Sequence, residues 1–196
     1  MYNISMKKIT FLLFIFILTG CATANTGLVT VSKSYQATSS PLIISNKTYM
    51  KLTSPNFSNG DFLPTNLTCL GEGTAPVLQI ADVPTSTLTL ALVVDDPDAP
   101  AGVFTHWLVW NIERSTTTIN AANLPDKAIV GVNSAGANKY FPPCPPSGTH
   151  HYYFRLYALD QKLNLSAKSS VKQLLKAMTG HVVDEAVLMG KFERKN

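Results

Sequence analysis

The sequence predicts a mainly β domain, with one or two peripheral helices near the C-terminus. After Met50 the chain consists of short runs rich in β-branched and aromatic residues, which Pro, Gly, Asn and Asp interrupt. Such runs are typical of half-buried strands. Strand patterns outnumber helical ones until Ser166, and we find no internal repeat. A single β-sandwich domain is therefore the expected architecture.

The composition fits one compact domain with a substantial core. The chain has 196 residues, of which 45% are apolar and only 14% are charged, and this balance argues against disorder. The formal net charge is +4, to which Lys7 and Lys8 of the leader contribute two charges. A charge this weak, without a clustered basic face, predicts no nucleic-acid partner.

The amino terminus has the pattern of a bacterial lipoprotein signal. Lys7 and Lys8 precede an uninterrupted apolar run, Phe11 to Leu18, that is too short to span a bilayer. The run leads into Leu-Thr-Gly-Cys, which resembles a lipobox. We expect a signal peptide over residues 1–20 and a lipid on Cys21, which would anchor the protein in the cell envelope.

Residues 21–45 are expected to form a flexible tether, followed by one domain over residues 46–196. The tether is rich in Ser, Thr and Asn and shows no sustained period. Three alternatives stay open: a plain signal peptide cleaved near Ala22–Ala24, an early strand at Leu42–Ser45, and a start at Met6 instead of Met1.

Export changes the meaning of the other two cysteines. With Cys21 lipidated, Cys69 and Cys144 form an even pair in an oxidising compartment. We predict a disulfide between them, closing a loop of about 75 residues. The alternative is two buried free thiols.

Three strands have the clearest pattern. They are expected at Leu88–Val94, Trp107–Ile112 and Tyr152–Leu159, where β-branched and aromatic residues concentrate. A helix is expected over Ser169–Met178, with an apolar stripe of Val171, Leu174, Leu175 and Met178, a serine cap and Gly180 after its end. A second, shorter helix is expected from Asp184 to Leu188.

Two polar clusters lie where strands meet loops, about forty residues apart. The first spans Asp95–Pro100 and continues to His106 and Trp107. The second spans Cys144–Tyr152 and contains a Pro-Pro-Ser-Gly-Thr-His-His-Tyr run. Because proline fixes φ, both loops should be stiff enough to hold functional side chains in place.

These clusters resemble the two signatures of the phosphatidylethanolamine-binding protein family, and the nearest branch is the bacterial Raf kinase inhibitor-like proteins. The first signature matches Asp96-Pro97-Asp98-Ala99-Pro100 with His106-Trp107 and Asn111, and the second matches Pro145-Pro146-x-Gly148-x-His150-x-Tyr152. The resemblance covers residues 50 to 193 approximately. It is supported by matches at Gly60, Pro64, Cys69, Pro76, Gly180, His181 and Gly190.

The resemblance implies a Greek-key β-sandwich with a small pocket at one end, where the two signatures meet. The implied ligand-binding residues are Asp96, His106, Pro145, Pro146, His150 and Tyr152. Asp98 and Gly148 would brace the loops. The chain has His151 where the family commonly has Arg, and the loss of this permanent cation predicts a looser or more pH-dependent rim.

The chemistry of these residues fits a small anion such as a phosphate group. Imidazole and phenol groups offer N–H and O–H donors, and a turn at Gly148–His150 would add backbone N–H groups. Asp96 would orient an imidazole. We expect a non-catalytic binding protein with no catalytic residue and no cofactor.

Three other functions compete with anion binding. A metal site could use Asp96 and the histidines, but metal-ligand spacings are absent and His150 and His151 should point to opposite faces of a strand. A hydrolase could use Cys144 with His150, but no nucleophile-elbow motif exists. The more serious alternative, which the family also implies, is an inhibitor that binds a protease or another envelope or host enzyme.

Overall fold

The computed structural model describes residues 49–194. The expectations outside this range are the signal peptide over residues 1–20, the lipid on Cys21, the tether over residues 21–45 and the alternative strand at Leu42–Ser45. Ser45–Asn196 forms one compact unit, and both hydrophobic clusters of the described part are built from residues 50–192. We therefore expect this unit to fold without the residues that precede it.

Antiparallel strands make up most of the described chain, which confirms the predicted mainly β class. The strands are β1 (Lys51–Thr53), β2 (Leu78–Ala81), β3 (Thr89–Asp96), β4 (Phe104–Glu113), β5 (Thr118–Ile119), β6 (Ile129–Val130), β7 (Gly148–Leu159) and β8 (Val182–Arg194). The helices are the 3-10 turn η1 (Thr65–Leu67) and the α-helix α1 (Val171–Met178).

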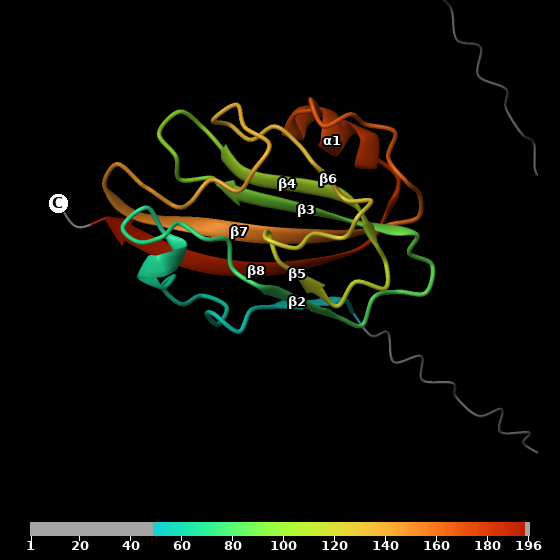
Figure 1. The fold of residues 1–196 in the computed structure, drawn as a ribbon, viewed down its shortest axis with the longest axis horizontal. Helices are drawn as coiled ribbons and strands as arrows, with labels where there is room; N and C mark the ends of the chain where they lie inside the picture. Colours follow the sequence, from blue (N-terminus) through green and yellow to red (C-terminus); the bar gives the residue numbers. More distant parts are fainter. Residues whose placement is uncertain (1–48, 195–196) are drawn as a thin grey trace, which may run out of the picture. The chain divides into compact units, whose positions relative to one another are not determined.

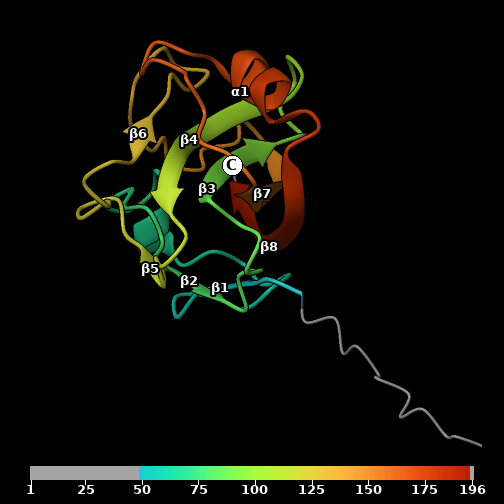
Figure 2. The same cartoon turned by 90° about the vertical axis from the view of Figure 1, so that its right-hand side faces the viewer.

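The strands form two sheets, seen one above the other in Figure 1 and end-on in Figure 2. One sheet has the order β6-β4-β3-β7-β8 and the other has the order β1-β2-β5. In the larger sheet β3, β4 and β6 are neighbours in chain order, and β7 returns to lie beside β3. This is the connection of a Greek key, as expected.

The main core lies between the two sheets. β3 contributes Leu90, Leu92 and Val94, whose side chains share one face because they alternate along the strand. The smaller sheet contributes Leu78 and Ile80 from β2. The same core includes Val94, Trp107 and Tyr152, so it reaches the end of the larger sheet at which both signatures lie.

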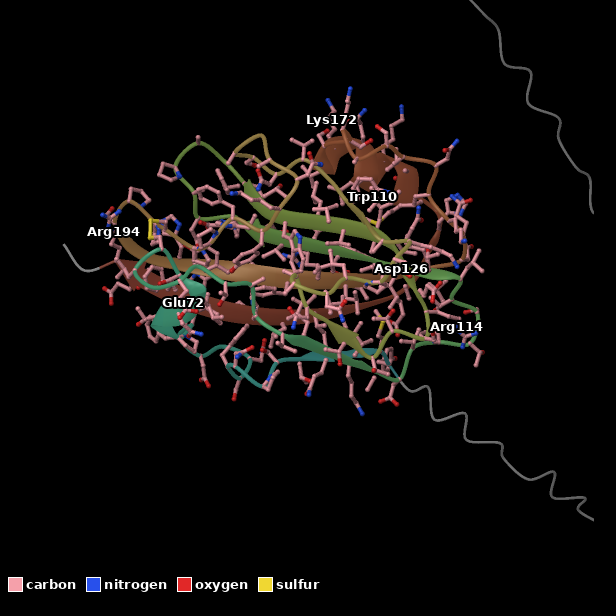
Figure 3. The ribbon with its side chains drawn as sticks, viewed as in Figure 1. Glu72, Trp110, Arg114, Asp126, Lys172 and Arg194 are labelled. Atoms are coloured by element: carbon pink, nitrogen blue, oxygen red, sulfur yellow. A yellow bond between two sulfur atoms is a disulfide. The ribbon has the colours of Figure 1, made fainter. Side chains whose placement is uncertain are left out.

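The helix α1 covers the other face of the larger sheet. Ala91 and Val93 of β3 and Trp110 of β4 pack against Leu174 and Met178 of the helix. Figure 3 shows Trp110 between the sheet and α1. The middle of β3, residues 90–94, is continuously apolar and is buried on both faces, as is usual for buried central strands.

The predicted helix over Ser169–Met178 is confirmed to within two residues. Ser170 caps α1, and its backbone N–H donates to Gln173 Oε1 at 2.9 Å. Leu175, expected on the apolar stripe, is instead 46% exposed. Within residues 49–194 no helix is both long and apolar enough to cross a membrane.

The second predicted helix, from Asp184 to Leu188, is wrong. These residues lie inside β8, which pairs with β7 from Gly148 to Leu159. The buried side chains of β8 follow a period of two: Ala186, Leu188 and Phe192. Long pairing with a central strand outweighed the local helical preference.

The predicted disulfide between Cys69 and Cys144 is present, with the two Cα atoms 5.4 Å apart. It joins the segment after η1 to the chain that leads into β7. The Cys69 N–H also donates to the Pro143 carbonyl at 3.0 Å. The second signature is thus linked to a distant part of the chain by both a covalent bond and a hydrogen bond.

Candidate ligand-binding pocket

A small pocket lies at the end of the larger sheet where β3 ends and β4 and β7 begin. Its volume is about 150 Å³, below the range of about 300–1,000 Å³ that is usual for drug-sized ligands. All six residues predicted to bind a ligand line it, and so do five others. The lining residues are Asp96, Ala99, Pro100, Phe104, His106, Phe141, Cys144, Pro145, Pro146, His150 and Tyr152.

A β-bulge directs His106 into this pocket. Along β4, Phe104 pairs with Asp96 and Thr105 with Asp95, but the next pair is Trp107 with Val94, so His106 is an extra residue. Strict alternation next to the inward-facing Trp107 would turn His106 to the opposite face. The bulge instead brings the His106 ring to 5.2 Å from the ring of Tyr152, measured between centroids.

His106 is held by two hydrogen bonds to Phe141, one from its ring and one at its backbone. Its Nδ1 lies 2.7 Å from the Phe141 carbonyl oxygen, and the Phe141 N–H donates to the His106 carbonyl. A carbonyl oxygen can only accept, so Nδ1 carries a proton. In the neutral ring the other nitrogen, Nε2, is therefore a hydrogen-bond acceptor.

His106 is buried, and its Nε2 has no hydrogen-bond partner among the described residues. Burial lowers the pKa of this imidazole below its ordinary value, against the opposing effects of the Phe141 carbonyl and of Asp96. The neutral form is thus favoured near pH 7. The expectation that His106 presents an N–H donor to an anion therefore holds only when the ring is protonated.

Asp96 and His150 form a buried pair across the sheet. The side chain of Asp96 is 5% exposed and that of His150 is 8% exposed, with 2.7 Å between Asp96 Oδ2 and His150 Nδ1. The other carboxylate oxygen accepts the Asp98 N–H at 2.9 Å. Because both Asp96 oxygens have partners, this geometry suits an orienting role.

Tyr152 contributes a hydroxyl group at the base of the pocket. The residue is fully buried and its hydroxyl has no partner among the described residues. Burial raises the pKa of this phenol, and the charges of Asp96 and Asp98 raise it further. The group therefore keeps its proton and can donate it to a ligand oxygen.

Asp98 and His151 form a second pair at the rim. Asp98 Oδ2 accepts the His151 backbone N–H at 2.8 Å and contacts His151 Nδ1 at 2.7 Å. These two hydrogen bonds from His151, the side-chain one first, lower the pKa of the Asp98 carboxyl. His150 and His151 lie on opposite faces of β7, so one histidine faces the pocket and the other faces solvent.

The predicted N–H nest at Gly148–His150 is wrong, because these residues already belong to β7. Gly148 pairs with Arg194, and His150 pairs with Phe192 in the ladder with β8. Gly148 is exposed with φ of 71° and does not line the pocket. Its function there is to let the chain enter β7 through a left-handed conformation.

Sequence reasoning missed the aromatic walls and a nearby cation. Phe104 lies 4.8 Å from His106 between ring centroids, and its place next to the first signature was a usable signal. Phe141 lies in an irregular segment, and the sequence around it gave no signal that it forms part of the pocket. Arg194, which Figure 3 shows beside the disulfide, has its guanidinium 3.9 Å from Cys144 Sγ.

A metal site finds no support in the arrangement of ligand-type side chains. In the part of the chain that the structure describes, no three His, Cys, Asp or Glu side chains are grouped so as to hold an ion. The Cys144 sulfur is bonded to Cys69, so it is not a thiol nucleophile.

Comparisons with known proteins agree with this geometry. A UPF0098 protein from Methanothermobacter thermautotrophicus is 43% identical over 150 residues, covering 74% of this chain and 99% of that protein. The crystal structure of a phosphatidylethanolamine-binding protein homologue from Chlamydia trachomatis is similar at 40% identity, with a TM-score of 0.71 over 75% of this chain and 99% of that chain.

A second similar solved structure is that of E. coli YbcL, a member of the mammalian phosphatidylethanolamine-binding protein family. It is 29% identical to this chain, with a TM-score of 0.71 over 76% of this chain and 100% of that chain. The family model for phosphatidylethanolamine-binding proteins matches residues 53–193. This chain therefore belongs to the phosphatidylethanolamine-binding protein family.

Proposed function

We propose that this protein binds a small anion, a phosphate or a phosphorylated head group, in the pocket formed by Asp96, His106, His150 and Tyr152. The observation that carries the proposal is a pair of buried, unpartnered polar atoms, His106 Nε2 and the Tyr152 hydroxyl, on two residues that line one pocket of about 150 Å³. Buried polar atoms usually have partners, so two unpartnered atoms on residues that line one small pocket favour a polar ligand.

The walls of the pocket fit a compact ligand. Phe104, Phe141 and two prolines give it an apolar lining, so its few polar atoms fix the orientation of whatever enters. Arg194 lies close to Cys144, which lines the pocket, so its positive charge would attract an anion towards this rim. These features favour one phosphate-sized group over a long acyl chain.

Non-catalytic binding is the simplest chemistry for this set of residues. Cys144 is held in the disulfide, and the pocket contains no serine or lysine that could act as a nucleophile. Both oxygens of Asp96 are engaged, so this carboxylate is poorly placed to activate water. The residues can bind and orient an anion.

We further propose that the protein is anchored in the bacterial cell envelope by a lipid on Cys21. The support is the sequence pattern of residues 1–21. Wild-type cells should incorporate a labelled fatty acid into the protein and retain it in the membrane fraction, whereas Cys21→Ser should abolish both. Absence of labelling in the wild type would mean that the leader is a plain signal peptide, and unchanged labelling in the variant would mean that the lipid is not on Cys21.

The binding proposal is tested by NMR titration of the chain without residues 1–21. Inorganic phosphate and phosphoethanolamine should each cause saturable shifts at millimolar concentrations or below. The shifts should be confined to Asp96, His106 and the first residues of β7. His106→Ala and His150→Ala should lose them, and His181→Ala, which changes an exposed histidine bonded to Asp160, should retain them.

The absence of any shift at millimolar ligand would contradict anion binding. It would favour the alternative, a protein-binding inhibitor that acts through its outer surface. The same conclusion would follow if pocket variants lost anion binding and kept an inhibitory effect on a protease or another envelope enzyme.

A further inference from the structure

An anion that enters this pocket meets acceptors as well as donors. Asp96 is a buried carboxylate, and neutral His106 uses Nδ1 for its bond to the Phe141 carbonyl, which leaves Nε2 as an acceptor. The Tyr152 hydroxyl is the one lining side chain that donates whatever the histidine protonation. A fully ionised phosphate would thus face the Asp96 carboxylate and the bare lone pair of His106 Nε2.

We propose that the pocket binds its ligand together with one proton, which lies between a ligand oxygen and His106 Nε2. The ligand class that fits is a phosphate monoester, or free phosphate, in its monoprotonated form, in preference to a phosphodiester. This inference rests on the proposed function and specifies the chemical form of its ligand.

The geometry favours a ligand that brings its own proton. A phosphate monoester has a second pKa of about 6, so near neutral pH its monoanion is easily reached. That monoanion has one hydroxyl to donate to His106 Nε2 and oxygens to accept from Tyr152. A phosphodiester has no such hydroxyl, so His106 itself would have to be protonated, which its burial opposes.

The groups around His106 determine how readily its ring takes up a proton. Asp96 of β3 raises the pKa of His106, which favours protonation of the ring. His150 of β7 lowers that pKa, and Tyr152 of β7 keeps its own proton. The segment around Phe141 contributes a carbonyl and, at Cys144, a disulfide sulfur that does not titrate. A carboxylate beside the pocket disfavours additional negative charge on the ligand.

The test is calorimetry on the chain without residues 1–21, with phosphoethanolamine and its matched diester, glycerophosphoethanolamine. Titrations at about pH 7.5 in two buffers of different ionisation enthalpy give the number of protons taken up per ligand. We expect an uptake of about one proton for the monoester. Its affinity should fall about tenfold for each unit of pH above about 7, and the diester should bind at least about tenfold more weakly.

A variant pair provides the control. His106→Gln can turn an amide N–H₂ towards the ligand, so it should bind the dianion and the diester without proton uptake, while His181→Gln should behave as the wild type. Monoester binding without proton uptake would overturn this inference and leave the proposed function standing. If neither the monoester nor the diester binds, both this inference and the proposed function are overturned. The wild-type proton count does not depend on how well His106→Gln folds.

Discussion

At the scale of single residues, the hydroxyl of Tyr152 and the two ring nitrogens of His106 decide what the pocket can hold. The tautomer of His106 follows from its bond to the Phe141 carbonyl, a contact between chain segments 35 residues apart. The sequence predicted that His106 and Tyr152 share a site. It could not predict which nitrogen carries the proton, because the irregular segment around Phe141 has no pattern.

Tyr152→Phe removes one hydroxyl from the base of the pocket and leaves its shape unchanged. A hydrogen bond to a charged group contributes about 1.5–3 kcal/mol, so phosphate should bind at least about tenfold more weakly. Calorimetric titration measures the change. Tyr153→Phe, on the opposite face of β7, is the control, and equal affinities for the two variants would exclude Tyr152 as a ligand donor.

Arg194→Gln tests the cation at the rim. The guanidinium is exposed, so it should attract anions over a short range that salt screens. We expect a loss of phosphate affinity of a few-fold at low ionic strength, shrinking towards none in about 1 M salt. A loss that is the same at all salt concentrations would contradict this role.

Asp98→Asn tests the rim pair through its pH dependence. The pKa of Asp98 is lowered in the fold, so the stabilisation is present above its ordinary value of 3.8 and is lost as the pH falls through the lower folded value. Because both side chains are about 40% exposed, the difference should be below about 1 kcal/mol.

Urea unfolding of the wild type and of Asp98→Asn at a series of pH values measures this difference. It should be largest near neutral pH and should vanish in strong acid. A difference that does not change with pH would mean that the Asp98 charge contributes nothing to the rim.

At the scale of elements, a strand could be predicted from the sequence when its apolar pattern was long enough to be recognised. Long aromatic and β-branched runs mark β3, β4 and β7, and the central residues of these three strands were predicted. β1, β2, β5 and β6 have two to four residues each, too few for a period to be recognised. The bulge at His106 was unpredictable, because a single extra residue leaves no mark in the sequence. β8 was misread although its alternation was visible.

Gly190→Ala tests the close contact between β8 and the segment that precedes η1. A methyl group on Gly190 would overlap the side chain of Leu63 and lie 3.0 Å from Phe57. Overpacking of a core typically costs about 1–3 kcal/mol, and we expect a loss of stability of that size in chemical denaturation. Val187→Ala, at an exposed position of the same strand, should change stability far less.

At the scale of the whole molecule, the sequence predicted the family, the Greek-key sandwich and the convergence of two distant clusters on one pocket. The convergence was predicted only from the resemblance to the family. The local sequence around Asp96 does not indicate that it lies beside His150. The walls at Phe104 and Phe141 and the rim cation Arg194 depend on how strands and loops meet, which residue types alone do not encode.

Removing the disulfide with Cys69→Ala and Cys144→Ala together tests how the second signature is held. The bond closes a separation of 75 residues, and the chain-entropy estimate for such a loop is about 4–5 kcal/mol. We expect the free energy of unfolding to fall by about 2–5 kcal/mol, measured by denaturant titration. An unchanged free energy of unfolding would mean that the disulfide does not stabilise the fold and only shapes the pocket wall, which includes Cys144.

The most direct test of the central claim is a crystal structure of the chain without residues 1–21, grown free of phosphate and then soaked in millimolar phosphoethanolamine. We predict that the phosphate group lies in the pocket, with one oxygen at about 2.5–3.0 Å from the Tyr152 hydroxyl and another at a similar distance from His106 Nε2. A phosphate bound elsewhere, or a pocket that stays without ligand while binding is measured in solution, would contradict the account.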